Sequence, residues 1–165
     1  MTLGPIPTTQ TVLSEDEQQL CRWIAEQART GTGRVHYTDA QTALGYFAEA
    51  LGALQPSDPG YERARMGEID AKIRLTPSAA TQSFLAYAQE QPDQVDAGDY
   101  HKVGVQLSER SAFTDAVVVL DAGLKRFPDD PKLTEAMDRT SAAAQEAGDS
   151  SALDKLKGLG YVGGG

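Results

Sequence analysis

The segment AGDYHKVGVQLSERSAFTDAVVVLDAGLKRFPDD, residues 97 to 130, decides the fold of this chain. Each half of the segment places apolar residues at the spacing of one buried helical stripe. The stripe of the first helix comprises Tyr100, Val103, Gly104 and Leu107, and that of the second comprises Phe113, Ala116, Leu120, Gly123 and Leu124. Pro128 closes the unit, because proline cannot continue a helix. The segment therefore predicts two short antiparallel helices that pack together.

This pattern resembles a tetratricopeptide repeat. In that family an aromatic, an aliphatic, a small and a large residue line the first helix; alanine, a large apolar and a small residue line the second; and proline follows. The series of alanine, large residue, small or aromatic residue and closing proline recurs about every 36 residues, which extends the resemblance over residues 38–130. Its members are Ala43, Phe47, Ala50 and Pro56, then Ala80, Phe84, Tyr87 and Pro92, then Ala116, Leu120, Gly123 and Pro128.

Capping residues, prolines and glycines predict the remaining helices. Ser14 with Glu17 and Thr38 with Gln41 are capping pairs, so we expect helices from about residue 15 to 31 and from about 38 to 54. Further helices are expected at about 60–75, 76–91, 131–147 and 150–159. Met66, Ile69 and Ile73 form the expected buried stripe of the helix over 60–75.

The predicted fold class is all-α. The resemblance implies a right-handed superhelical stack of antiparallel helix pairs, with seven or eight helices expected from the pattern. We expect a flexible leader over residues 1–13, a helical domain over 14–157 with three helix pairs and C-terminal capping helices, and a glycine-rich apolar tail over 158–165.

The composition of the chain argues against several classes of function. The net charge of −9 argues against a nucleic-acid partner, because phosphate backbones repel an acidic surface. No apolar run approaches the roughly 20 residues that a membrane span requires. Residues 1–13 contain neither Lys nor Arg nor a continuous apolar run, so no secretory signal is expected. We expect a soluble, cytoplasmic protein, or a periplasmic one if a signal segment has been removed.

Candidate chemical sites are few. His36 and His101 are the only histidines and Cys21 the only cysteine, without the clustered spacing of a metal site. The prediction is therefore no metal, no cofactor and no catalytic activity. An alternative stays open, in which Cys21, Arg34, His36 and Tyr37 line a small-molecule pocket that gives the chain an enzymatic or ligand-binding accessory role.

The resemblance also indicates where a partner would bind. In tetratricopeptide-repeat proteins the first helices of the pairs line a concave groove that holds peptides or partner domains. The positions that this implies here are His101, Lys102, Val105, Ser108 and Glu109 in the best-matching unit, and Glu62, Arg65 and Glu68 in the preceding one.

One function of the family is not expected here. Its chaperone-adaptor members hold a C-terminal carboxylate with Lys, Asn and Arg, but this chain has no asparagine and carries Val105 at the Asn position. We therefore expect a larger, partly apolar protein partner. The leading hypothesis is a non-catalytic scaffold, adaptor or complex subunit.

The C-terminal tail is a second candidate surface. Leu159, Tyr161 and Val162 are apolar residues within a glycine-rich segment. Such a tail docks on the chain's own last helices, docks on a neighbouring molecule, or stays disordered. Docking of Tyr161 and Val162 on a neighbour would make the chain a self-assembling repeat protein, and a homo-oligomer is the corresponding alternative.

Overall fold

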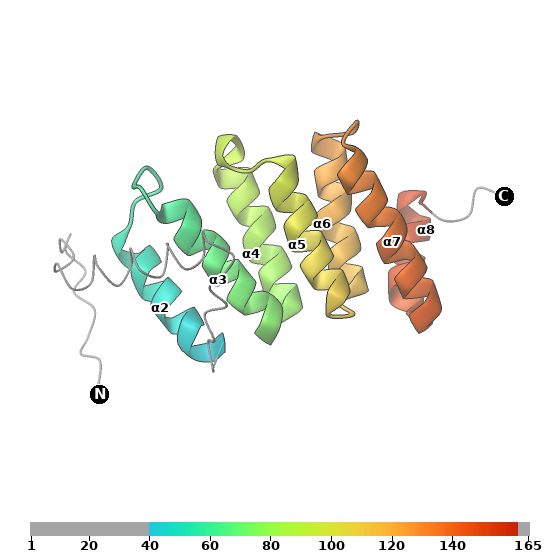
Figure 1. Ribbon diagram of the computed structural model, residues 1–165, viewed down its shortest axis with the longest axis horizontal. Coiled ribbons are helices and arrows are strands. Elements are labelled where there is room, and N and C mark those ends of the chain that lie inside the picture. The colour runs from blue at the N-terminus through green and yellow to red at the C-terminus, as the bar shows by residue number, and fades with distance from the viewer. Residues whose placement is uncertain (1–39, 162–165) are drawn as a thin grey trace. The chain divides into compact units, whose positions relative to one another are not determined.

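The computed structural model describes residues 40–161, with the side chain of Thr42 left aside (Figure 1). Two compact units divide the chain, one ending at Glu68 and the other beginning at Ile69. The regular structure within 40–161 is helical throughout, which confirms the predicted all-α class. The helices are α2 (Ala40–Ala53), α3 (Tyr61–Leu75), α4 (Pro77–Glu90), a short 3-10 turn η1 (Pro92–Gln94), α5 (Ala97–Glu109), α6 (Phe113–Arg126), α7 (Pro131–Ala147) and α8 (Ser150–Leu159). The helix expected over 15–31 lies outside the described residues.

Local sequence explains where these helices begin. Pro77 opens α4 at a position where its missing amide has no partner to lose. Asp96 accepts from the Asp99 amide while Asp99 accepts from the Asp96 amide, so the two carboxylates form a capping box at α5. Asp130 accepts from the amides of the second and third residues of α7, at 2.9 and 3.0 Å.

In the first unit α2 buries Ala43, Phe47 and Ala50. The ring of Phe47 lies against Gly67 so closely that a β-carbon there would meet its Cζ at 2.3 Å. The packing of this unit therefore favours glycine, which has no β-carbon, at position 67.

The expected stripe of α3 is partly wrong. Ile69 and Ile73 are buried, but Met66 is only half-buried. Besides the two isoleucines, α3 also buries two small side chains, Ala64 and Ala71. The physical reason is that a close helix approach selects small residues, which a search for large apolar side chains overlooks.

In the second unit each helix from α5 onward packs against its successor, and α4, α5 and α6 also contact the helix after next, namely α6, α7 and α8. Figure 1 shows α4 to α8 following one another, with α8 at the far end of this row. Side chains that are fully buried here include Phe84, Val103, Leu107, Leu120, Leu133 and Leu156.

Small and large residues interlock between α5 and its neighbours. A β-carbon on Gly104 would lie 2.5 Å from Cδ2 of Leu120, and one on Gly123 would lie 2.8 Å from Cβ of Tyr100. Tyr100 also meets Phe84 edge to face, with ring centroids 5.0 Å apart and an interplanar angle of 82°. These contacts fix α5 between α4 and α6.

The turn between α5 and α6 contains a strained residue. Ser111 has φ of +60°, and the amide of Ala112 bonds the carbonyl of Leu107 at 3.0 Å, so Ser111 holds the left-handed position at which glycine usually ends a helix. The left-handed conformation costs an ordinary L-residue about 1–2 kcal/mol.

We expect Ser111→Gly to raise the free energy of unfolding by about 0.5–1 kcal/mol, because relief of this strain exceeds the added chain entropy. Urea unfolding followed by circular dichroism measures the change. Ser111→Ala is the matched control and should give no such gain, since it keeps the β-carbon. Equal stability of the glycine and alanine variants would rule out strain at this turn.

Among residues 40–161, no helix combines the length and the apolar character that crossing a membrane requires.

Candidate partner-binding surface

Helix α5 carries most of the candidate residues and is anchored at its first turn and along one face. Its capping box fixes the first turn, and its buried stripe of Tyr100, Val103, Gly104 and Leu107 packs into the second unit. Successive residues of a helix are rotated by about 100°, so His101, Lys102, Val105, Ser108 and Glu109 occupy a continuous arc outside this stripe. We call these five residues the α5 surface.

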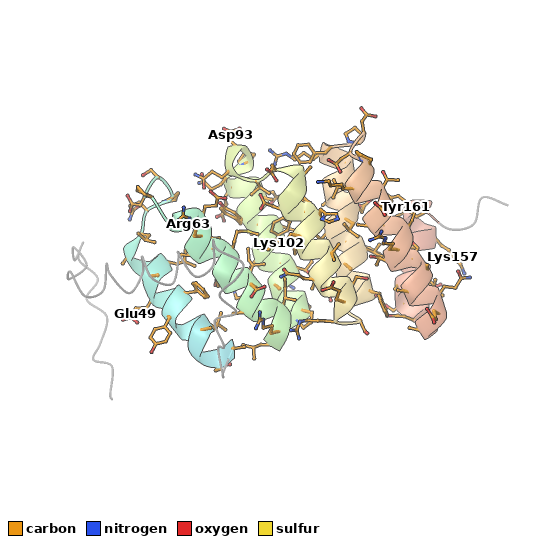
Figure 2. The ribbon with its side chains drawn as sticks, in the orientation of Figure 1. Glu49, Arg63, Asp93, Lys102, Lys157 and Tyr161 are labelled. Atoms are coloured by element: carbon orange, nitrogen blue, oxygen red, sulfur yellow. The ribbon has the colours of Figure 1, made fainter. Side chains whose placement is uncertain are left out.

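The structure places all five members of the α5 surface together on one face. Lys102 and Glu109 are exposed, whereas His101, Val105 and Ser108 are half-buried. Lys102 is labelled on α5 in Figure 2. Val105 lies nearly opposite the buried stripe and is still partly sheltered. This aliphatic side chain lies among polar residues of the same arc, so the α5 surface is mixed in character.

A small network of hydrogen bonds and one ion pair lies next to the α5 surface. Asp70 of α3 accepts a hydrogen bond of 2.9 Å from Nε2 of Gln106, and its other carboxylate oxygen lies 3.2 Å from Nη2 of Arg74. Lys72, also on α3, donates to Oγ of Ser83 on α4 at 2.7 Å. Within the second unit these bonds tie the last turns of α3 to α5 and to α4. They position the backbone that presents the α5 surface.

The two charged side chains of the α5 surface are exposed. Within residues 40–161, neither Lys102 nor Glu109 forms an ion pair, and the two lie about two helical turns apart along α5. Burial raises the pKa of the Asp99 carboxyl above its ordinary value, the more so because Asp96 is near, while its bond to the Asp96 amide and the charge of Lys102 oppose the rise. Lys102 thus contributes positive potential near the N-terminal end of the surface, and Glu109 contributes negative charge at the other end.

The candidates on α3 belong to the first unit. Glu62 is exposed, whereas Arg65 is half-buried and forms an ion pair of 3.1 Å with Glu68, itself buried. The Arg65–Glu68 pair is thus already engaged within the chain. Of the three α3 candidates, Glu62 is the one whose side chain is exposed to solvent.

Tyr161 has a partner within its own chain. Its hydroxyl donates to Oδ1 of Asp121 on α6 at 3.3 Å, although 40% of the residue is exposed. Tyr161 is labelled in Figure 2. The other tail candidate, Val162, lies outside the described residues. So does the alternative pocket of Cys21, Arg34, His36 and Tyr37.

Sequence reasoning missed two polar centres, Asp70 and Asp121. Each acid has a base one turn later, Arg74 and Lys125, at the spacing of helix ion pairs. That spacing was a usable signal for the pairs themselves. The further bonds to Gln106 and Tyr161 join distant parts of the sequence, and no local pattern indicates them.

Within 40–161, no group of three or more His, Cys, Asp or Glu side chains is arranged to hold a metal ion.

No protein-family model, curated protein or solved structure matches this chain.

Proposed function

We propose that this chain is a non-catalytic protein-interaction scaffold of tetratricopeptide-repeat type, acting as an adaptor or as a subunit of a larger complex. In this proposal the pairs α5–α6 and α7–α8 are successive repeats of a right-handed superhelical stack that α3 and α4 extend. The support is the series of contacts in the second unit, where helices meet both the next helix and the one after it. Such contacts are typical of stacked helix hairpins.

The observation that carries the binding role is the composition of the α5 surface. A partly sheltered Val105 lies among polar side chains, with Lys102 and Glu109 unpaired within the described residues. Protein interfaces commonly combine an apolar centre with a polar rim. The partner that fits best is a protein or peptide that covers Val105 and offers an acid near Lys102 and a base near Glu109.

The test is affinity capture of the full chain at native expression level with quantitative mass spectrometry. We expect the natural chain to capture a stoichiometric partner. The double variant Lys102→Glu/Val105→Asp should capture at least about tenfold less of it, because the substitutions remove an interface anchor. Lys132→Glu changes an exposed charge at the start of α7 and should retain the partner. Circular dichroism checks that each variant is folded.

Two results would count against the proposal. One is the absence of any stoichiometric partner, and the other is equal loss of the partner in the Lys102/Val105 and Lys132 variants.

The predicted absence of enzymatic activity and the predicted cytoplasmic location stay predictions. The alternative of self-assembly would give a larger sedimenting mass than that of one chain, which analytical ultracentrifugation measures.

A further inference from the structure

Asp121 is a nearly buried carboxylate in the middle of α6, with 9% of its surface exposed. A buried carboxylate is costly unless other groups replace the water that it loses. Two groups do so here: Nζ of Lys125 lies 2.7 Å from Oδ2, and the hydroxyl of Tyr161 lies 3.3 Å from Oδ1. Lys125 is one turn away on the same helix, whereas Tyr161 follows the C-terminal end of α8. The bond to Tyr161 is therefore a tertiary contact.

The end of α8 is shaped to make this contact. Gly160 has φ of +86°, its amide bonds the carbonyl of Lys157 at 3.0 Å, and the amide of Tyr161 bonds the carbonyl of Leu156 at 2.9 Å. This pair of bonds is the glycine-dependent turn that ends many helices. It sets the direction of the backbone at Tyr161 and so directs the phenol toward α6.

Besides this contact, a hydrogen bond of 3.3 Å from Oγ1 of Thr114 on α6 to Oγ of Ser151 and a small buried face hold α8. It is ten residues long and its buried side chains are Ala152 and Leu156. Helices of this length are not stable alone in water, so α8 persists because it is docked. Ala152 completes an apolar cluster with Phe113 of α6 and Ala144 of α7, and α8 thus covers the apolar surface that those two helices share.

We propose that Tyr161 is a latch: its hydroxyl bond to Asp121, supported by Lys125, holds α8 closed over the apolar cluster of Phe113 and Ala144. Release of the latch frees α8 as a local event, while α5 and α6 stay folded. Short elements with few buried side chains open in this way at a lower free energy than the whole fold. When the bond between Tyr161 and Asp121 breaks, α8 can undock, and its undocking exposes apolar surface on α6 and α7.

The ionisation of the latch follows its surroundings. Burial raises the pKa of the Tyr161 phenol above 10, and the charge of Asp121 and the hydrogen bond to it add to the rise, while the charge of Lys125 opposes it. The bond to Asp121 likewise raises the pKa of Lys125. Both groups hold their protons more tightly in the folded chain. Their stabilising contribution is therefore complete below about pH 10 and is lost as the pH rises through their folded-state pKa values.

Hydrogen exchange of the full chain at neutral pH tests the latch. We expect Tyr161→Phe to accelerate exchange of the α8 amides about three- to tenfold, the effect of losing one hydrogen bond, without change in α5 or α6. Tyr46→Phe is the matched control, because Tyr46 is 42% exposed on α2, and should leave α8 unchanged. Unchanged α8 exchange in Tyr161→Phe, or equal acceleration along the whole second unit, would overturn the latch.

A second measurement keeps the test independent of overall stability. In a carbon-13 tyrosine NMR titration, the pKa of Tyr161 should lie above 10 and should fall in Asp121→Asn, without reaching the value of a free tyrosine because burial remains. In the double variant Tyr161→Phe/Asp121→Asn, α8 should exchange no faster than in Asp121→Asn alone. An unchanged Tyr161 pKa in Asp121→Asn, or fully additive acceleration in the double variant, would contradict the direct bond.

Discussion

Replacing Phe84 by alanine should lower the free energy of unfolding by about 3–5 kcal/mol, the usual cost of deleting a buried aromatic ring. Phe84 has no exposed surface on α4, and its ring meets Tyr100 of α5 edge to face at 5.0 Å. Deletion of the ring leaves a cavity and removes this contact. Because folded domains are stable by about 5–15 kcal/mol, the loss is a large share of the total. Urea unfolding followed by circular dichroism measures it.

Leu75→Ala is the matched control for Phe84→Ala. Leu75 is also a large apolar residue, but 40% of its surface is exposed at the end of α3. Its truncation should change the stability by no more than about 0.5 kcal/mol. If Phe84→Ala and Leu75→Ala lower the free energy of unfolding equally, the packing of Phe84 between α4 and α5 does not stabilise the fold as expected.

The second large effect is expected from adding a single carbon. Gly104→Ala should destabilise the chain by about 1–3 kcal/mol, because the new β-carbon would lie 2.5 Å from Cδ2 and 2.6 Å from Cγ of Leu120. Leu120 is fully buried and has little room to move. The result would be informative, since alanine favours a helix over glycine by about 1 kcal/mol and the opposite sign would be expected without the contact. Thermal or urea unfolding gives the sign directly.

Two further variants isolate this contact. Leu120→Ala alone should cost about 2–5 kcal/mol, but in Gly104→Ala/Leu120→Ala the new methyl group has space, so the double variant should be more stable than the sum of the single effects by at least about 1 kcal/mol. Gly158→Ala is the control glycine, because its β-carbon would meet nothing within 4 Å, and it should gain about 0.5–1 kcal/mol. A gain in Gly104→Ala equal to that in Gly158→Ala would contradict the interlock.

Helix positions were predictable because the chain marks them locally. Prolines open α4 and α7, and an Asp at each N-cap starts α5, α7 and α8. These signals act within one turn of the helix end, so they can be read without knowledge of the fold. The five residues of the α5 surface were expected from the family resemblance, and in the structure they lie outside the buried stripe of α5.

Contacts between distant parts of the sequence were not predictable in the same way. The bond from Tyr161 to Asp121 depends on how α8 packs on α6, and the bond from Gln106 to Asp70 depends on how α5 lies beside α3. In α3 the close approach of Phe47 to Gly67 shows why small residues matter as much as large ones. A pattern of large apolar side chains alone therefore misplaces one member of the α3 stripe, Met66.

We propose that the helices of the second unit stack in series and do not surround one common axis. The most direct measurement is a set of nuclear Overhauser effects between aromatic and methyl groups in the isotopically labelled full chain. Serial stacking predicts cross-peaks between Phe84 and Tyr100 and between Phe113 and Ala152, and none between side chains of α4 and α8, which lie at opposite ends of the row in Figure 1. Strong cross-peaks between α4 and α8 would show a closed bundle and would contradict the claim.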